Sequence, residues 1–384
     1  MHQPTISGSS RIRRTPYSKR VEEAGVKSYS VYNHMLLPTV FDTLENDYHH
    51  LKTAVQVWDV SVERQIEIIG PDATKILQMV TPRDISKMKD DQCYYIPMVD
   101  KHGLMINDPV AVKLDKNRYW ISIADSDVIY YFKGLAEGMG LNVNIFEPDV
   151  NIISIQGPKS KILIERMFGK EISELKFFRH GKVFFNGKKM IVARSGWSHQ
   201  ICFEVYVDGS MNGQDMWDKF FSLGNDLDVR AGCPNLIERI ESGLLSYGND
   251  VNQTNTPYEA GLGKFLSSGV SEGCLAYDIL QTKTEPQRLI KPIEITGEPI
   301  KPITYSLQVS NSNGEVVGQI TSAAWSPDFK VNVAIGMIDR EYWNEKNSLF
   351  LNFTKNDKRQ IIINLSLIHI SEPTRLRRIS YAVF

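Results

Sequence analysis

A strand–helix pattern that occurs twice limits the folds open to this chain. Residues 65–69 form an apolar run that is followed by Gly70-Pro71 and an amphipathic segment. Residues 151–156 precede Gly157-Pro158 and a second amphipathic segment in the same order. Each glycine ends a strand, and each proline suits the first turn of a helix, where its missing N–H has no partner to lose. The sequence therefore predicts one strand–helix module used twice.

Further strands and helices follow from the spacing of apolar residues. The pattern predicts strands at 110–114, 119–123, 182–185, 190–193 and 203–207, and helices at 42–57, 127–137 and 213–223. Strands that alternate with helices in this irregular order are typical of a mixed α+β fold with antiparallel sheets.

The clearest helix signal covers residues 233–247. Pro234 stands near its start and Gly248 at its end, and one face is apolar, formed by Leu236, Ile240, Leu244 and Tyr247. Arg239 and Glu241 fall outside this stripe. By themselves they are interpreted as surface charges.

The composition of the chain changes at several points that we interpret as boundaries. Residues 1–27 are polar and are expected to form a loosely packed arm, and the main body is placed at 28–275. Short strands with turn signals after residue 285 predict a small all-β domain at 285–364. Residues 365–384 look like the translation of a sequencing-adapter end, so we exclude them as a non-native tail.

Charge and cysteine content narrow the class of protein. The formal net charge is −1, which argues against a general nucleic-acid or membrane-surface binder. The four cysteines have neither metal-type spacing nor a disulfide framework, which fits a reducing compartment. We find no signal peptide and no apolar stretch long enough to span a membrane. The sequence predicts a soluble, cytoplasmic protein.

The stretch from Tyr95 to Pro109 contains the first candidate for chemistry. Two apolar runs flank a turn at residues 100–103, and the second run ends in Asn107-Asp108-Pro109. Proline keeps the residue before it extended, so the side chain of Asp108 has a restricted direction. This pattern fits a carboxylate aimed into a cavity, and it also fits an ordinary turn.

Several standard catalytic signatures are absent from the sequence. There is no glycine-rich phosphate loop, no paired Cys-x-x-Cys and no Gly-x-Ser-x-Gly. The adjacent His49 and His50 point in different directions on a helix, so they are not expected to share a metal. We expect no metal cofactor.

Separated blocks of the sequence resemble the glycine cleavage T-protein (aminomethyltransferase) family. The blocks are Trp58-Asp-Val-Ser61 with Gly70-Pro71, residues 95–108, Ala193-Arg-Ser-Gly-Trp197 with Phe203-Glu204, residues 239–250 with 256–259, and residues 317–322 with 326–327. They occur in the family's order. The resemblance implies three subdomains in a ring around a central folate channel, a small C-terminal β-barrel, and tetrahydrofolate as cofactor.

The resemblance also assigns roles to individual residues. It places Asp108 beside the reactive N5 of tetrahydrofolate as the catalytic residue, and Glu204 on the pterin ring. A pterin edge carries adjacent N–H donors that suit a carboxylate acceptor. Aromatic residues are implied along the folate channel, and an arginine is implied near the cofactor, where its charge would suit a folate carboxylate. These positions are Tyr95, Phe177, Trp197 and Arg239.

The sequence departs from the family on the substrate side. Asn107-Asp108 stands where Asp-Asp is usual, Ala124-Asp125 where Asn-Ala is usual, and Trp197 where tyrosine is usual. Residues 199–202 read His-Gln-Ile-Cys in place of a Gly-Glu-Asp-Gly-like loop. A narrower set of blocks resembles the dimethylsulfoniopropionate-demethylating branch of the family: residues 31–38, 56–60, 107–109, 120–126 and 230–239.

That branch moves an S-methyl group of dimethylsulfoniopropionate to N5 of tetrahydrofolate and leaves 3-methylthiopropionate. The resemblance implies such an enzyme of sulfur metabolism, with a small-molecule sulfonium substrate and a homodimer as a further expectation. Residues expected to bind the sulfonium or its carboxylate are Tyr32, Ser122, Trp197 and Tyr206, with Trp197 first because indole is the best aromatic face for a cation. Two alternatives remain: an aminomethyltransferase of the glycine cleavage type, and a non-catalytic folate-binding assembly factor.

Overall fold

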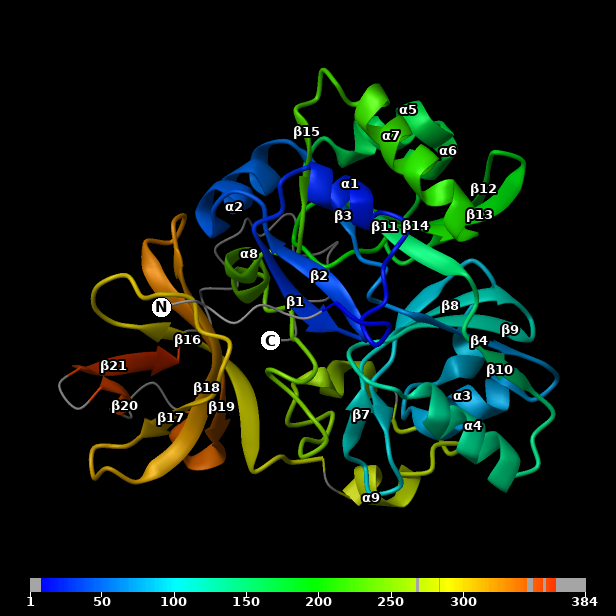
Figure 1. The fold of residues 1–384 in the computed structure, drawn as a ribbon. Coiled ribbons are helices and arrows are strands. Elements are labelled where there is room, and N and C mark those ends of the chain that lie inside the picture. The colour runs from blue at the N-terminus through cyan, green and yellow to red at the C-terminus, as the bar shows by residue number, and fades with distance from the viewer. Residues whose placement is uncertain (1–7, 267–268, 283, 344–347, 355–356, 364–384) are drawn as a thin grey trace.

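The computed structural model describes residues 8–266, 269–282, 284–343, 348–354 and 357–363. Two α+β layers and a β-barrel make up the molecule, with the barrel on one side, drawn in yellow to red (Figure 1). The mixed α+β class with antiparallel sheets is confirmed. The predicted non-native tail at 365–384 lies outside the described residues.

The first layer is a five-stranded antiparallel sheet with helices packed on it. Its strand order is β10 (Asn144–Phe146), β4 (Gln65–Ile69), β9 (Arg118–Ser122), β8 (Val110–Asp115) and β5 (Cys93–Tyr95). The helices α3 (Ala73–Val80) and α4 (Ile129–Gly138) bury their apolar faces against this sheet. A short hairpin of β6 (Met98–Val99) and β7 (Met105–Asn107) and the 3-10 turn η1 (Ile85–Lys87) belong to the same part of the chain.

The second layer is a six-stranded sheet. Its order is β12 (His180–Phe185), β13 (Lys188–Ala193), β14 (Cys202–Asp208), β11 (Val150–Gln156), β3 (Val55–Asp59) and β15 (Val229–Gly232), and only β15 runs parallel to its neighbour. It is covered by α5 (Ser160–Phe168) and α7 (Gly213–Leu223), with α6 (Lys170–Ser173) and η2 (Ser210–Asn212) beside them. One buried cluster contains side chains of both layers, including Trp58, Trp120 and Tyr206. The two sheets therefore share part of their core.

The repeated strand–helix module is confirmed as β4–α3 and β11–α5. The glycine in each copy is required by close backbone contact. Gly70 has a φ of 142°, and a Cβ there would lie 2.5 Å from the Asn142 carbonyl oxygen. Gly157 has a φ of 115°, and a Cβ there would lie 2.5 Å from the Ala54 carbonyl oxygen. The connecting turns can thus pack tightly against the neighbouring segments only with glycine.

The C-terminal part forms a closed six-stranded barrel. Its strands are β16 (Arg288–Ile295), β19 (Val331–Asp339), β18 (Val316–Ser326), β17 (Leu307–Ser310), β20 (Leu349–Thr354) and β21 (Asp357–Ile363), with η4 (Arg340–Tyr342) after β19. A second face of β18 and β19 packs on α8 (Leu236–Glu241), and η3 (Leu262–Leu266) and α9 (Tyr277–Thr282) belong to the same cluster. The barrel is therefore joined to the rest of the molecule by a hydrophobic interface.

The N-terminal arm is packed more tightly than expected. Before the hairpin of β1 (Ser28–Tyr32) and β2 (Met35–Val40) lies α1 (Ser18–Glu23). Tyr17 and Val21 are 0% and 1% exposed, and the Tyr17 ring lies 6.0 Å from that of Trp217 on α7. The prediction of a loose arm is wrong for this segment, because its apolar residues complete the core of the second layer.

Two predicted helices are shorter in the structure. The segment 42–57 gives α2 (Leu44–Thr53) followed directly by β3, and the segment 233–247 is helical only in α8. Gly243 has a φ of 64°, which ends α8 well before Gly248. Arg239 and Glu241 are buried side chains, 3% and 6% exposed, so interpreting them as surface charges is wrong. None of the described helices has the length and apolar character needed to cross a membrane.

Candidate active site

Three carboxylates from separate segments approach one another where the two layers meet. Asp108 follows β7, Glu204 lies on β14, and Glu63 lies in the turn between β3 and β4. Glu63 is in electrostatic contact with both of the others. The structure therefore brings the two predicted carboxylates to one site and adds Glu63, which the sequence analysis did not select.

The side chains at this site differ in how far they are buried. Glu63, Asp108, Tyr32 and Tyr95 are each half-buried. Glu204 is more deeply placed and only 5% exposed.

Burial without a positive partner makes these groups hard to ionise. Burial raises the pKa of Asp108 to about 7, against the opposing effect of its hydrogen bond from Tyr95. Burial also raises the pKa of Glu204, and burial together with the charges of Glu204 and Asp108 raises that of Glu63 well above its usual value. Among the described residues, no lysine, arginine or histidine forms an ion pair with any of the three.

Two tyrosines stand next to Asp108. The Tyr95 hydroxyl donates to Asp108 Oδ2 at 2.9 Å, and the Tyr95 ring lies 5.5 Å from that of Phe265. Tyr32 is in electrostatic contact with Asp108 and Glu63. Burial, followed by these charges, raises the pKa of both phenols. Both tyrosines therefore remain protonated and can act as hydrogen-bond donors at neutral pH.

Two more predicted residues contact each other behind Glu204. The hydroxyl groups of Ser122 and Tyr206 are 3.3 Å apart, and Ser122 donates to Gln65 Oε1 at 2.9 Å. The Tyr206 ring is fully buried and stacks on Trp120 with ring centroids 5.8 Å apart. The Ser195 hydroxyl donates to Glu204 Oε2 at 2.5 Å. This side of the site is a connected set of buried polar groups within the shared core.

Trp197 and Arg239 lie together at the barrel side of the site. The Arg239 guanidinium carbon is 5.7 Å from the centre of the Trp197 ring. The same guanidinium donates to Asp250 Oδ2 at 2.7 Å and to the Ser322 hydroxyl at 2.5 Å. The charge of Arg239 is thus already balanced by the buried Asp250. In this arrangement the guanidinium is not available for the predicted pairing with a folate carboxylate.

Phe177 lies at the edge of the shared core. Its ring is 4.8 Å from that of Phe178, and Phe178 packs on the cluster that contains Tyr206. Phe177 itself remains partly accessible. Its role in folate binding stays a prediction.

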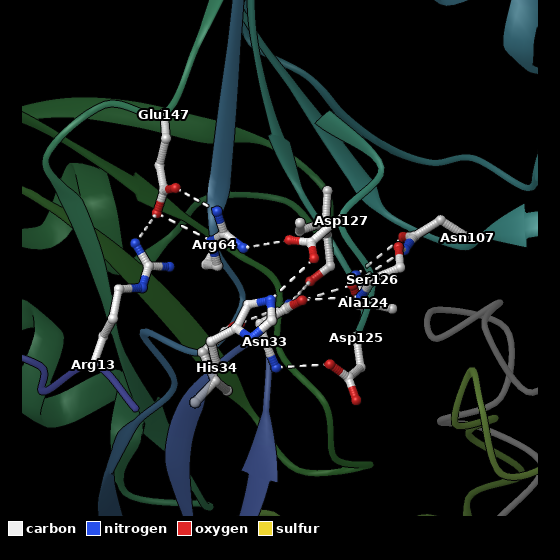
Figure 2. A network of polar contacts seen from close by, with 12 residues as sticks. Arg13, Asn33, His34, Arg64, Asn107, Ala124, Asp125, Ser126, Asp127 and Glu147 are labelled. Atoms are coloured by element: carbon white, nitrogen blue, oxygen red, sulfur yellow. Dashed lines mark hydrogen bonds and ion pairs between the residues drawn. The ribbon is translucent and has the colours of Figure 1, made fainter. Parts of the chain in front are cut away.

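A network of polar contacts fixes the backbone on both sides of the site residues (Figure 2). Asn107 donates to the Ala124 carbonyl at 3.1 Å and to the Ser126 hydroxyl at 2.8 Å, and its Oδ1 accepts from the Ala124 and Asp108 amides at 3.0 Å. The side-chain oxygen of Asn33 accepts from the Ser126 amide at 2.9 Å. Both asparagines therefore bind the segment that follows β9.

The network continues around Glu63. Asn33 donates to the Val62 carbonyl at 2.9 Å, and its own amide donates to Asp125 Oδ1 at 2.7 Å. Arg64 pairs with Glu147 at 2.5 Å and with Asp127 at 3.1 Å. Tyr32, Glu63 and Asp108 thus each have a sequence neighbour held by this network. Asn107 and Asp125, two departures from the family pattern, have direct structural roles in it.

Other candidate positions give weaker support for a site. One surface cavity is lined by residues that include Tyr29, Pro38 and Asp59, and another by residues that include His50 and Arg230. Neither is lined by a carboxylate of the central cluster, and we place the site at the cluster because acids without ion-pair partners among the described residues meet tyrosines there. No group of potential metal ligands is found among the described residues.

Both parts of the chain match models of known protein domains. Residues 17–269 match the GCVT N-terminal domain, and residues 293–362 match the glycine cleavage T-protein C-terminal barrel domain. The chain is 52% identical to the dimethylsulfoniopropionate demethylase DmdA of Ruegeria pomeroyi over 88% of this chain and 93% of that protein. It is 25% identical to an aminomethyltransferase of Caldanaerobacter subterraneus over 85% and 88%.

One solved structure shows the same fold. The glycine cleavage system aminomethyltransferase T from Bartonella henselae superposes with a TM-score of 0.82, covering 93% of this chain and 98% of that chain at 19% identity. The predicted arrangement of α+β subdomains with a C-terminal barrel is confirmed by this similarity and by the six-stranded barrel itself.

Proposed function

The chain belongs to the glycine cleavage T-protein family, and from this premise we propose that it is a tetrahydrofolate-dependent demethylase of dimethylsulfoniopropionate. It transfers one S-methyl group to N5 of tetrahydrofolate and releases 3-methylthiopropionate and 5-methyltetrahydrofolate. The observation that carries this proposal is the cluster of Glu63, Asp108 and Glu204, which are buried or half-buried, lie near one another and have no cationic partner among the described residues.

The residues present fit a reduced pterin. Such a ring offers several N–H donors along one edge. The carboxylates of Asp108 and Glu204 are acceptors without ion-pair partners among the described residues. Tyr95 and Trp197 supply partly accessible aromatic surface. We assign Glu204 to the pterin ring, held in its orientation by Ser195.

The chemistry needs orientation more than activation. When bound, tetrahydrofolate supplies the N5 lone pair that forms the new N–CH₃ bond, while the electrons of the broken S–CH₃ bond stay on sulfur. Sulfur leaves as a neutral thioether, so the donor is already activated and the protein has to hold the reacting groups in line. The demethylation releases one proton, from N5.

We assign Asp108 to take that proton. Its Oδ2 accepts from the Tyr95 hydroxyl, and no other described residue donates to its Oδ1. A pKa of about 7 lets the carboxylate accept a proton and return it to solvent at neutral pH. The Tyr95 hydrogen bond fixes the direction in which Oδ1 points.

Trp197 is our candidate for the aromatic surface against the sulfonium. A cation placed on an indole face is stabilised by about 1 to 2 kcal/mol when water is excluded. We assign Arg239, whose charge is balanced by Asp250, to holding this ring in place. Tyr32, Ser122 and Tyr206 complete the proposed substrate side, and Phe177 the folate channel.

The remaining assignments complete the proposal. We assign folate binding to residues 28–275 and the barrel domain to 285–364. The four cysteines are free and buried, which fits a cytoplasmic location. The partners are the sulfonium and tetrahydrofolate, with a homodimer as the proposed assembly and no nucleic acid or membrane.

One assay separates this function from the two alternatives. Purified protein is incubated with tetrahydrofolate and dimethylsulfoniopropionate, and 5-methyltetrahydrofolate is measured by chromatography. We expect stoichiometric formation of 5-methyltetrahydrofolate and 3-methylthiopropionate. Turnover only with an aminomethylated carrier protein would favour an aminomethyltransferase, and folate binding without any turnover would favour the assembly factor.

A further inference from the structure

Glu63 differs from the other two carboxylates of the site in having no hydrogen-bond donor. Asp108 accepts from Tyr95, and Glu204 accepts from Ser195. No described residue donates a hydrogen bond to the Glu63 carboxylate or forms an ion pair with it. This side chain is nevertheless half-buried. A buried carboxylate without a partner is unfavourable, so a ligand that brings a partner is bound more tightly.

The position of Glu63 is fixed by its neighbours in the chain. The Val62 carbonyl accepts from Asn33, and Arg64 pairs with Glu147 and Asp127 (Figure 2). These contacts hold the turn between β3 and β4 on both sides of Glu63. The carboxylate therefore stands on a supported backbone, which is the arrangement of a binding group.

The charges around Glu63 indicate which ligand suits it. Its electrostatic contacts are Glu204 on β14 and Asp108 after β7, both acidic, and the neutral phenols of Tyr32 and Tyr206 are close to it. Each of these four groups is therefore negative or neutral. A cation placed here gains attraction from up to three carboxylates, whereas a neutral or anionic group gains none.

We propose that Glu63 is a specificity-determining residue that recognises the positive charge of the methyl donor. The inference rests on the proposed function and states that Glu63 recognises the positive charge of the substrate. A sulfonium has no N–H to donate, so its recognition depends on charge and on contact with its methyl groups. A bound cation stabilises the ionised form of Glu63, so the carboxyl group loses its proton to solvent as the sulfonium binds and then supplies the opposite charge, while Trp197 supplies an aromatic face.

The same recognition of charge distinguishes substrate from product. Loss of a methyl group turns the sulfonium into a neutral thioether, and the attraction to Glu63 disappears in the same step. Product is then held only by the contacts that both molecules share. Charge recognition therefore favours entry of the donor and release of the thioether.

The test compares two ligands of the same shape. Dimethylsulfoniopropionate and 4-methylpentanoate share a carbon skeleton and a carboxylate, but the second has a neutral C–H in place of the sulfonium. Calorimetry measures the binding of each ligand to wild type and to Glu63→Gln in buffer that contains no tetrahydrofolate. We expect the variant to bind the sulfonium about 10- to 100-fold more weakly and the neutral ligand within about 2-fold of wild type.

Two controls guard the interpretation. Glu67→Gln changes another buried glutamate, which pairs with Arg118 and Trp120 outside the cluster, and should leave the ratio of the two affinities unchanged. Glu63→Asp keeps the charge and should keep most of the preference for the sulfonium. Tetrahydrofolate binding and circular dichroism report whether each variant is folded.

Equal losses for both ligands in Glu63→Gln, or no loss for the sulfonium, would overturn the inference. If that variant does not fold, Glu63→Ala takes its place, and the inference again requires a loss of about 10-fold or more for the sulfonium with little change for its neutral isostere. This result is independent of turnover. A wild type that prefers the cation but forms no methylated folate would contradict the proposed function and leave the charge preference standing.

Discussion

Two groups of carboxylates in this molecule have opposite surroundings. At the barrel interface Asp250 pairs with Arg239 at 2.7 Å and also accepts from Ser246, Thr321 and Ser322. At the central site Glu63, Asp108 and Glu204 have no cationic partner among the described residues, from which they together receive two side-chain hydrogen bonds. The residue types are the same, and the difference lies in the partners that the fold supplies.

The contrast separates stability from binding. A buried ion pair that is satisfied by several donors fixes the barrel against α8, and removing one member leaves an uncompensated charge. Unpaired acids destabilise the empty protein, and a ligand that supplies donors or positive charge removes that cost. We therefore expect substitutions at the interface to affect unfolding, and substitutions at the site to affect ligands and turnover.

The largest expected effect comes from the interface. Arg239→Met leaves Asp250 buried and unpaired, and should lower the free energy of unfolding by about 3 to 5 kcal/mol in urea titrations. The double variant Arg239→Met/Asp250→Asn removes the charge as well and should recover a large part of this loss. A loss below about 1 kcal/mol in the single variant would contradict the contrast between interface and site, because the Arg239–Asp250 pair would then contribute little to stability.

The second expected effect is a dependence of stability on pH. Asp108 has a pKa of about 7 in the folded protein, above its ordinary value, so the folded state holds a proton that the unfolded state releases. This contribution is full below about pH 4 and is lost as the pH rises through about 7, with a size on the order of 3 to 4 kcal/mol. Thermal unfolding of ligand-free protein between pH 5 and pH 8 should show it.

The Asp108→Asn variant serves as the reference for that experiment. It cannot ionise at this position, so the difference in stability between wild type and variant should change in favour of the variant as the pH rises. Parallel curves for the two proteins would show that Asp108 is not the buried acid described here.

The third expected effect concerns turnover. Asp108→Asn removes the proton acceptor and should lower kcat about 100-fold, or about 2.7 kcal/mol, with little loss of stability at neutral pH. Asp115→Asn, at the exposed end of β8, is the matched control and should keep wild-type turnover. Steady-state formation of 5-methyltetrahydrofolate measures both. A variant with unchanged kcat would remove Asp108 from the chemistry.

The smallest expected effect sharpens the assignment of the aromatic face. Trp197→Ala should weaken binding of dimethylsulfoniopropionate about 10-fold, or about 1 to 2 kcal/mol, and change folate affinity far less. Trp343→Ala removes a ring that contacts Lys291 on the barrel and is the control. Calorimetric titration with each ligand gives both numbers. Equal losses for sulfonium and folate would take Trp197 out of the sulfonium site.

Much of the fold could be predicted because its signals are local. The paired glycine–proline turns are required by close backbone contacts, and the helix at 213–223 was predicted with the observed bounds of α7. The segment after Glu241 was predicted as helix because its apolar spacing continues. In the structure that apolar face packs on the barrel instead, after the chain turns at Gly243.

The site could be predicted only in part. Resemblance supplied Asp108 and Glu204, and the structure brings both next to Glu63. Glu63 belongs to none of the family blocks of the sequence, although it is a charged residue within a run that is otherwise mostly buried, from Val55 to Ile68. The pairing of Arg239 with Asp250 and Ser322 joins parts of the chain far apart in sequence, so no local pattern reveals it.

The central claim is that the unpaired acids of the two layers receive one reduced folate in a shared cavity. A crystal structure of the protein with tetrahydrofolate tests it most directly. We predict that carboxylate oxygens of Glu204 and Asp108 both lie within hydrogen-bonding distance of the same pterin ring. A pterin that contacts only one of them, or that occupies the surface cavity beside Tyr29 and Asp59, would contradict the account.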